Sequence, residues 1–575
     1  MKKLLNLIKP VISELVIVLL FALAANNFVG DTITGDGAGY YEYLPSVFIH
    51  NDLVRINMTD QEKDEFIKRV DHFGFYSEQG EHWVNRYPCG TAVLESPFFL
   101  ITWMVTDMQG IDSDGYQKPF HRSIYFAAIF YLFLSLLFLK KVLVLYRVNR
   151  LSIVLSQVLL VFSTSVTQYA TSNAAFSHIY SLFAITAFIF FAKKYFQYKR
   201  VNFYLYACLF LGLIVILRQV NGLSILFVPF LAGSWGNFKV GVTCILRKPI
   251  AFTKGIVIAG AVVFIQMLAW YLQTGHFIVY SYQGYGFNFL SPQIVNILFS
   301  YRKGLFIYTP VLLLGLAGVF RWLYKREYYA FFSWMFFFCI LTYVLSSWCF
   351  WYYGGSYGLR AYIDFYAIFF IPFALMFNHL ASWSRLMVIL LAFFIIPLNL
   401  IQTYQYKTYI LHGANMDKEK YWKIFLKTDE RYRGILWKKD YDYNKYEQIK
   451  EINLNDINVS PNSDSIFFKM KVSDFAAFKN VKLIHLSFEN DFRENDYSRL
   501  AISIDDKNGN NKLFHRPYLI HFAEDDFNKR QRGFYNYELP FIQDVENQIL
   551  TFVICTGNEG IEMKDVKISF LSRIE

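Results

Sequence analysis

Long apolar runs alternate with short polar loops over the first 404 residues of the chain. A helix that crosses a membrane needs roughly 20 apolar residues, and about eleven segments approach this length. They lie near residues 11–28, 121–139, 151–168, 176–192, 203–217, 220–235, 255–273, 305–320, 328–346, 361–378 and 386–403. The pattern therefore predicts a polytopic α-helical membrane protein.

One further apolar segment, residues 91–105, does not fit this series. It contains Glu95 and Pro97, and it is shorter than the roughly 20 residues that a crossing requires. Counting it as a span would also reverse the side on which every later basic loop lies. We expect a juxtamembrane or re-entrant helix here, inside a long first outer loop that covers residues 29–120.

The basic residues between the apolar segments predict the orientation of the chain. Lys and Arg gather at residues 140–150, 193–200, 239–254 and 321–326, and such loops are typically cytoplasmic. This arrangement places the N-terminus inside and everything after residue 404 outside. The first apolar segment has no small-residue cleavage site, so we interpret it as a retained helix instead of a signal peptide.

The pattern changes after Tyr404. Residues 405–460 are polar and charged, with a short amphipathic stretch at 418–427. From about residue 465, alternating runs predict about seven short strands separated by turn-forming residues such as 506–510. The runs are 466–472, 481–488, 500–504, 513–522, 533–539, 548–555 and 566–571. We predict a transmembrane domain, 1–404, and an extracytoplasmic domain, 405–575, with a β-sandwich-like fold.

Composition narrows the class of protein. Only 18% of the residues are charged and 55% are hydrophobic, whereas soluble domains carry about 25% charged residues. The net charge of +11 lies in loops between apolar segments instead of on one basic face, so we expect no nucleic-acid partner. The six cysteines lack Cys-x-x-Cys spacing, which predicts neither a zinc site nor a disulfide framework.

The first candidate for chemistry is Asp36, which follows the first apolar segment and is flanked by Gly35, Gly37 and Gly39. Glycines leave the backbone free to bring this carboxylate close to a ligand. A glycine-rich turn that leaves a helix explains the same residues without any function.

Other polar residues embedded in apolar sequence fall on the same predicted outer face. Ionisable side chains at membrane depth are costly and usually functional. The set comprises Arg86, Tyr87, Asn173, His178, Arg218, Arg302, Lys303, Trp351, Tyr352 and Arg360. Structural roles are also open for them. Arg302 and Lys303 can snorkel to headgroups. His178 can be a hydrogen-bonded packing residue, and the aromatic pair can belong to an interfacial belt.

The order of these features resembles the GT-C glycosyltransferases, in particular the protein O-mannosyltransferase and lipid A aminoarabinose transferase branch. Residues 85–90 stand in the place of that branch's Lys/Arg-x-Pro-Pro element, with Cys89 replacing the second Pro. Residues 301–306 and 351–360 resemble motifs of bacterial membrane proteins grouped with this branch. Many relatives carry an Asp-Glu pair where Gly37 follows the aspartate here, which makes Glu42 the candidate for a second carboxylate.

The resemblance implies an inverting glycosyltransferase at the outer face of a bacterial inner membrane. The donor is a sugar on polyprenyl phosphate, with its lipid tail in a groove between helices, and the acceptor is a hydroxyl of an envelope lipid, glycan or protein. Asp36 is the expected general base. The expected phosphate ligands are Arg302 and Arg360, followed by Lys303, Arg86 and Arg218.

The residues expected to contact substrate are Tyr40, Glu42, Tyr43, Tyr87, Asn173, His178, Trp351 and Tyr352. The scheme requires no metal, although a carboxylate, a phosphate and His178 together can hold a divalent ion. A transporter or flippase of a lipid-linked sugar is the alternative, but it needs repeated halves or broken helices near mid-membrane. A non-catalytic receptor or scaffold would need neither Asp36 nor the outer arginines.

Overall fold

The computed structural model describes residues 11–25, 33–53, 75–79, 82–282, 285–429, 432, 436, 445–491, 498–505, 511–515, 530–538, 548–556 and 560–573. The chain divides into two compact units. One comprises Met1–Thr403 with Gly413–Lys418, and the other comprises Tyr404–His412 with Glu419–Glu575. The predicted turn at residues 506–510 lies outside the described residues.

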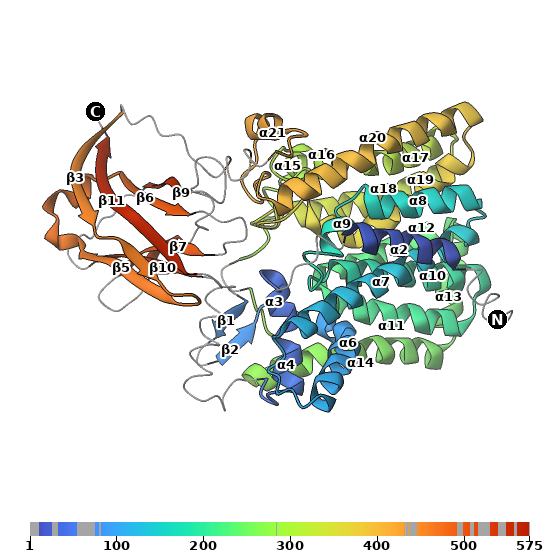
Figure 1. The fold of residues 1–575 in the computed structure, drawn as a ribbon. Coiled ribbons are helices and arrows are strands. Elements are labelled where there is room, and N and C mark those ends of the chain that lie inside the picture. Colours follow the sequence, from blue (N-terminus) through green and yellow to red (C-terminus); the bar gives the residue numbers. More distant parts are fainter. Residues whose placement is uncertain are drawn as a thin grey trace. The chain divides into compact units, whose positions relative to one another are not determined.

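Most of the long helices of the first unit run in one direction (Figure 1). They are α2 (Ile12–Ala25), α7 (Lys118–Leu145), α8 (Arg150–Phe162), α10 (His178–Tyr198), α11 (Val201–Leu217), α14 (Pro249–Thr274), α17 (Leu312–Tyr324), α18 (Tyr328–Ser346), α19 (Tyr366–Asn378) and α20 (Ser382–Lys407). Helix α10 is buried along most of its length, whereas α14 exposes most of its apolar surface. An apolar helix that leaves its surface exposed faces lipid.

Among the described residues, six helices are long and apolar enough to cross a membrane, or seven if one bent pair counts as a span. Four shorter apolar helices accompany them. Each predicted span contains a described helix, although the number of crossings stays a prediction. The protein is a multi-pass membrane protein.

Several predicted spans are interrupted by short or tighter helices. These are α9 (Val166–Tyr169), η2 (Gln219–Phe227) with α12 (Val228–Ala232), α16 (Leu305–Tyr308) and η3 (Arg360–Phe365). A further short helix, α15 (Ile294–Phe299), precedes α16 outside the predicted spans. After α8, the hydroxyls of Ser163 and Thr164 bond back to the carbonyls of Leu159 and Leu160, a pattern that competes with helix continuation. The interruptions place polar side chains at helix ends.

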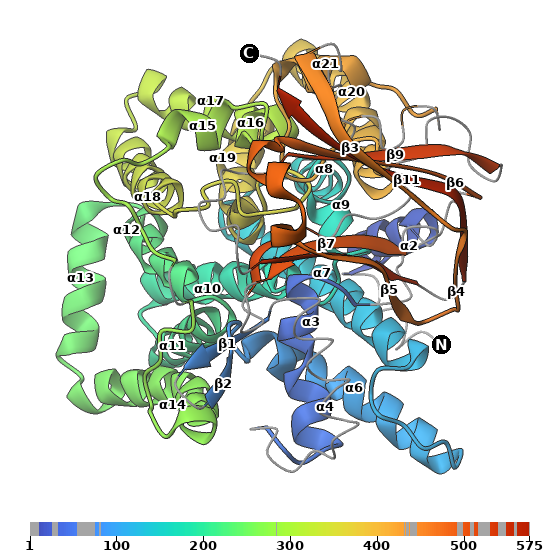
Figure 2. The same cartoon turned by 90° about the vertical axis from the view of Figure 1, so that its left-hand side faces the viewer.

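Helix α13 (Trp235–Leu246) bends by 118° from the preceding helix pair and runs across the bundle (Figure 2). The change of direction occurs at Gly233, whose φ is 80°. Ser234 then caps the new helix by accepting a hydrogen bond from the Asn237 amide. The predicted span at 220–235 therefore ends at this glycine.

Helix α6 (Gly90–Met108) also lies across the bundle (Figure 2), the orientation expected of a juxtamembrane helix. Its first residue is Gly90, where a Cβ atom would lie 2.5 Å from the carbonyl oxygen of Ile216. Glycine is needed because the backbones of α6 and α11 meet here. The start of α6 is thereby placed beside the end of α11. The remaining short elements are α3 (Asp36–Tyr41), α4 (Tyr43–Phe48), β1 (Tyr76–Gln79) and β2 (His82–Asn85).

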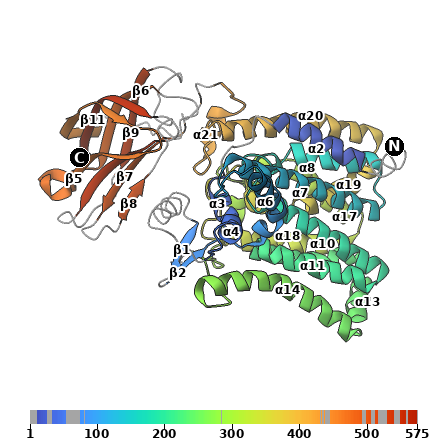
Figure 3. The same cartoon turned by 60° about the horizontal axis from the view of Figure 1, so that its bottom comes forward.

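The second unit contains α21 (Lys418–Ile424) and two antiparallel sheets (Figure 3). One sheet has the order β5 (Asp464–Lys471), β10 (Ile549–Cys555), β7 (Arg499–Asp505) and β8 (Asn511–His515). The other has the order β3 (Tyr446–Leu454), β11 (Ile561–Arg573), β6 (Leu483–Asp491) and β9 (Arg530–Glu538), and β4 (Ile457–Val459) also pairs with β11.

Apolar side chains of both sheets form one buried cluster, including Leu486 and Ile568 from one sheet and Ile502 and Phe552 from the other. The prediction of a β domain after the membrane helices is confirmed. Its start near residue 465 was placed too late, because β3 and β4 precede it. Strand β3 is at a sheet edge and carries charged residues, so its alternation is weak.

Candidate functional site

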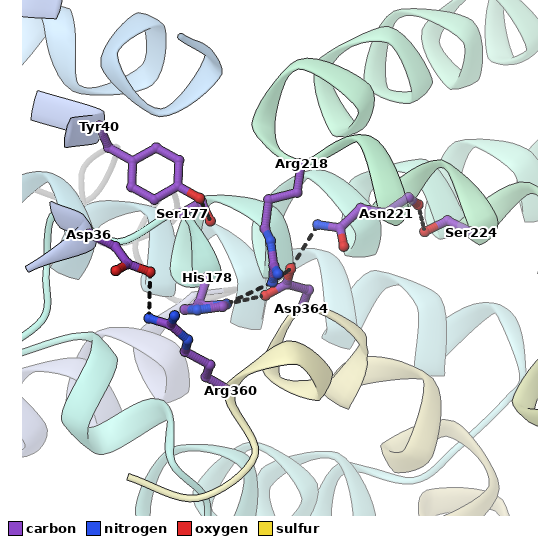
Figure 4. A network of polar contacts seen from close by, with 9 residues as sticks. All are labelled: Asp36, Tyr40, Ser177, His178, Arg218, Asn221, Ser224, Arg360 and Asp364. Atoms are coloured by element: carbon purple, nitrogen blue, oxygen red, sulfur yellow. Dashed lines mark hydrogen bonds and ion pairs between the residues drawn. The ribbon is translucent and has the colours of Figure 1, made fainter. Parts of the chain in front are cut away.

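Two arginine–aspartate pairs lie near one another in the helical unit (Figure 4). Asp36 is the first residue of α3, while Arg360 and Asp364 both belong to η3. Arg218 lies between α11 and η2. The site is therefore assembled from helix ends that are far apart in the sequence.

The first pair joins the predicted base to a predicted phosphate ligand. Arg360 Nη1 lies 2.6 Å from Asp36 Oδ2, and the two side chains are 15% and 28% exposed. The Arg360 guanidinium also lies over the ring of Phe176, 5.6 Å from its centre. Asp36 and Arg360 are thus brought into direct contact at a position that solvent can reach.

The backbone conformation and the close packing of α3 explain why glycines flank Asp36. Gly35 adopts a φ of 60° as α3 begins, a conformation that side chains with a Cβ rarely adopt. A Cβ atom at Gly39 would lie only 2.3 Å from the ring of Tyr87. The glycines therefore let α3 approach Tyr87, which keeps Asp36 close to the neighbouring rings.

The second pair is part of a network around the buried Asp364, in which the Arg218 side chain is 16% exposed. Its Oδ1 lies 2.7 Å from His178 Nδ1, and its Oδ2 accepts hydrogen bonds from Arg218 at 3.1 Å and from Asn221 at 2.7 Å. The Asp364 side chain is 0% exposed. A buried carboxylate with three polar partners is well compensated, so this pair is a fixed part of the fold.

Asp364 is the main residue that the sequence interpretation missed. It lies within the apolar segment at 361–378, and an ionisable residue at that depth is itself a signal of function or pairing. Because a carboxylate oxygen accepts, His178 Nδ1 donates its proton to Asp364, which leaves Nε2 on the other edge of the ring. In Figure 4 that edge of the ring faces the Asp36–Arg360 pair.

Tyrosines surround the two pairs. The Tyr40 and Tyr87 rings lie 4.7 Å apart, and the Tyr282 ring lies 6.3 Å from that of Tyr87. Burial raises the pKa of Tyr87, nearby Asp36 raises it further, and Arg360 opposes this rise. The pKa of Tyr40 is raised for the same main reason, burial, so both phenols keep their protons at neutral pH.

Tyr282 and Tyr353 also belong to this ring of tyrosines. Tyr353 lies within the predicted motif at 351–360, whereas Tyr282 was not predicted. Both interact electrostatically with Arg218 and Arg360, and burial raises the pKa of each. Tyr353 has a φ of 55° and Gly354 follows at 69°. A tyrosine in the left-handed region is unusual, so the tight turn before Arg360 is held by its surroundings.

Arg302 lies in a separate cluster. Its Nε donates to the Ala414 carbonyl at 2.9 Å and its Nη2 donates to Asn415 Oδ1 at 3.2 Å. The guanidinium carbon lies 3.5 Å from the centre of the Tyr352 ring and 5.9 Å from a ring of Trp351. The predicted residues Arg302, Trp351 and Tyr352 thus gather together, and Arg302 is engaged with the segment 413–415.

Lys303 is buried between these clusters. Its Nζ donates to the Ser356 carbonyl and, at 2.9 Å, to Ser356 Oγ. Burial lowers the pKa of Lys303 well below its ordinary value, and Arg360 and Arg302 act in the same direction. In this structure Lys303 holds the loop that precedes Arg360, instead of presenting its charge to a ligand.

The other predicted residues support the walls of the site. Glu42 accepts a hydrogen bond from Tyr116 at 2.9 Å and is buried, so it lies outside the network of Figure 4. Tyr43 donates to the Tyr87 carbonyl at 2.8 Å. The Arg86 carbonyl accepts from Ser281 at 2.9 Å.

The described part of the helical unit has hollows near two of the elements named above. Asn173, which accepts a hydrogen bond from Gln168, lines a small cavity together with Gly37 and Phe176. A largely apolar groove of about 300 Å³ lies between α6 and the start of α7, with Ile101 and Phe126 among its lining residues. Among the described residues, no group of three or more His, Cys, Asp or Glu is arranged to hold a metal ion.

Comparisons with known proteins give similarity at the level of fold. No protein-family model matches the sequence, and no curated protein matches it. The oligosaccharyltransferase AglB of Archaeoglobus fulgidus, solved with an inhibitory peptide and a dolichol-phosphate, aligns at a TM-score of 0.40 and 11% identity. The arabinosyltransferase EmbB of Mycobacterium smegmatis aligns at 0.41 and 9%.

The chain is similar to these two solved structures in the arrangement of its elements alone. The alignment covers 72% of this chain and 60% of AglB, and 98% of this chain and 64% of EmbB. Similarity at these TM-scores does not indicate a function by itself, so the function has to be inferred from the geometry of the site.

Proposed function

We propose that this protein is an inverting membrane glycosyltransferase that moves a sugar from a polyprenyl-phosphate donor to a hydroxyl acceptor. The observation that supports the proposal is the contact between Asp36 and Arg360 in a tyrosine-lined site of a multi-pass helical unit. An aspartate can accept a proton, and a guanidinium can bind phosphate oxygens. The two groups that the reaction needs therefore occur side by side.

The transfer is a single displacement. The acceptor hydroxyl loses its proton to Asp36 while its oxygen attacks the anomeric carbon of the donor sugar. The bond between that carbon and the phosphate oxygen breaks, and its electron pair leaves with the polyprenyl phosphate. Attack opposite the leaving group inverts the anomeric centre.

Arg360 stabilises the negative charge that develops on the departing phosphate. A fixed cation in a partly dry site stabilises such charge better than water does. Arg218 adds a second positive centre, but Asp364 compensates its charge. Tyr40 and Tyr87 retain their phenolic protons. Tyr40 is buried, whereas the half-buried Tyr87 offers a ring on which a sugar can stack.

The proposed setting is the outer face of a bacterial inner membrane, with an envelope lipid, glycan or protein hydroxyl as acceptor. The positive loops support this orientation, because they all fall on the opposite side of the helices in the sequence-based topology.

The test is turnover of Asp36→Asn in proteoliposomes, supplied with lipid-linked sugars extracted from the native host. We expect the rate of sugar transfer to fall by about 10²- to 10⁴-fold, because a positioned general base contributes this much. Mass spectrometry of the released polyprenyl phosphate measures the reaction. Asp107→Asn removes an exposed carboxylate on α6 and serves as the control with normal turnover.

Retained turnover in Asp36→Asn would remove Asp36 as the base. Movement of an intact sugar-lipid across the vesicle membrane, without chemical change, would support the transporter hypothesis instead.

A further inference from the structure

The two arginine–aspartate pairs differ in how firmly the carboxylate is held. Asp364 has three polar partners and is 0% exposed. Among the described residues, Asp36 forms one ion pair, with Arg360, and its side chain is 28% exposed. The Arg360 cation that the proposed function assigns to phosphate is therefore already occupied by the proposed base.

This occupation conflicts with catalysis. A guanidinium binds phosphate best when two of its N–H groups are directed at the phosphate oxygens, and Nη1 of Arg360 is engaged by Asp36 at 2.6 Å. A phosphate brought to Arg360 would also stand beside the Asp36 carboxylate, and like charges at that distance repel. Phosphate and carboxylate cannot both keep the best position on this guanidinium.

We propose that the donor phosphate displaces Asp36 from Arg360, so that binding of the prenyl-phosphate donor releases the base for the acceptor. The proposal rests on the proposed function and adds an order of events to it. Donor binds first, Asp36 is set free, and only then can the acceptor hydroxyl donate its hydrogen bond to this carboxylate.

Arg360 is the partner that stays in place. It belongs to the same 3-10 helix as Asp364, which is anchored by Arg218, His178 and Asn221. Its guanidinium rests on the Phe176 ring. The preceding loop is tied down by the bonds between Lys303 and Ser356. A phosphate therefore meets a cation with a fixed position.

Asp36 is the partner that can move. It is the first residue of a helix of only six residues, with Gly35 before it and Gly37 after it. Loss of the contact with Arg360 leaves the carboxylate at a partly exposed position, where water can solvate it. The cost of separating a partly exposed ion pair is small, on the order of 1 kcal/mol.

The exchange also accounts for product release. After transfer, Asp36 carries the acceptor's proton and is neutral, so it does not compete with the product phosphate. When Asp36 passes this proton to water, the carboxylate regains its charge and competes again for Arg360. The ion pair of the free protein re-forms as the polyprenyl phosphate leaves.

Binding of farnesyl phosphate, a short prenyl monophosphate, to the full chain in detergent tests the exchange by calorimetry. We expect Asp36→Asn to bind about fivefold more tightly than the wild type, because the competing ion pair, worth about 1 kcal/mol, is gone. Unchanged or weaker binding overturns the proposal. Asp36→Glu retains a competing carboxylate and is expected to bind like the wild type.

Two controls separate exchange from general electrostatics. Asp107→Asn removes a negative charge away from the pair and is expected to bind like the wild type; an equal gain in this variant overturns the proposal. Arg360→Lys retains a positive charge but not the planar fork, and we expect its affinity to fall by about tenfold. Wild-type affinity in Arg360→Lys also contradicts the proposal.

The exchange and the proposed function fail differently. If Asp36→Asn loses turnover but does not bind farnesyl phosphate more tightly, the role of Asp36 as general base is supported and the exchange is wrong. If this variant binds farnesyl phosphate more tightly but keeps its turnover, the exchange is supported and Asp36 is not the general base. Inorganic phosphate serves as a second probe: the same gain with both probes assigns the effect to the phosphate group, and a gain with farnesyl phosphate alone assigns it to the prenyl chain and overturns the exchange.

Discussion

The sequence makes Arg302 and Arg360 equal candidates for binding the donor phosphate, since both carry a guanidinium group and both lie on the predicted outer face. The structure gives them different neighbours. Arg302 is hydrogen-bonded to residues 414 and 415 and stacked on Tyr352, whereas Arg360 contacts the carboxylate of Asp36. The comparison shows that the role of an arginine depends on its partner: a guanidinium held by neighbouring residues is structural, whereas one held by a carboxylate that a ligand can replace is able to bind that ligand.

The largest expected effect is the difference in the rate of sugar transfer between variants that lack one or the other of these two arginines. Arg360→Ala should lower sugar transfer by about 10³-fold, because it removes the cation that faces the developing phosphate charge. Arg302→Ala should lower it by about tenfold or less, since its donors already serve the neighbouring segment. Initial rates in proteoliposomes measure both. Equal losses in the two variants would contradict the separate roles.

The second prediction compares how much the free energy of unfolding falls when each of the two aspartates is replaced. Asp364→Asn leaves Arg218, whose side chain is only 16% exposed, without its counter-charge, and we expect the free energy of unfolding to fall by about 2 to 3 kcal/mol. Asp36→Asn should cost about 1 kcal/mol or less, because its ion pair is partly exposed. Thermal melting in detergent gives the comparison. A larger loss for Asp36→Asn would show that the exposed pair, not the buried one, holds the fold.

The smallest effect concerns the pH dependence of stability through Lys303. Its pKa is lowered by burial, so between that value and the ordinary pKa of about 10.4 the unfolded chain binds more protons than the folded chain. Stability therefore rises with pH in this window. The raised pKa values of Tyr40 and Tyr87 act above about pH 10, where folded phenols keep their protons and stability falls as pH rises.

Lys303→Met should flatten the rise in melting temperature as the pH increases toward about 10, while the wild type retains it. The substitution also removes two hydrogen bonds to Ser356, which lowers stability at every pH by about 1 kcal/mol. A wild-type slope in Lys303→Met would show that Lys303 is already charged in the folded protein.

Much of the architecture could be predicted because apolar patterning decides it locally. Every predicted span contains a helix, and the runs at 500–504 and 548–555 correspond to β7 and β10. Burial of apolar side chains in lipid or in a sheet core depends on periodicity, which is visible in the chain itself. The edge strands β3 and β4 were missed because an edge strand does not need a clean alternation.

The site could be predicted only in part. Polar residues inside apolar sequence are conspicuous, which is why Asp36, Arg218, His178 and Arg360 were all singled out. Glu42 was expected near the substrate, but it bonds to Tyr116. Tyr282 is one tyrosine among 42 in the chain, and no local pattern distinguishes it from the others.

The sequence by itself determined the membrane helices, the β domain and the list of side chains able to hold a phosphate or accept a proton, because hydrophobicity and chemical type are properties of single positions. Tertiary structure alone decided the pairing of those side chains. Asp364 neutralises Arg218, and Asp36 contacts Arg360, because helix ends that are distant in the chain meet at the same place. Pairing depends on distance in space, and burial then sets how readily each pair can open.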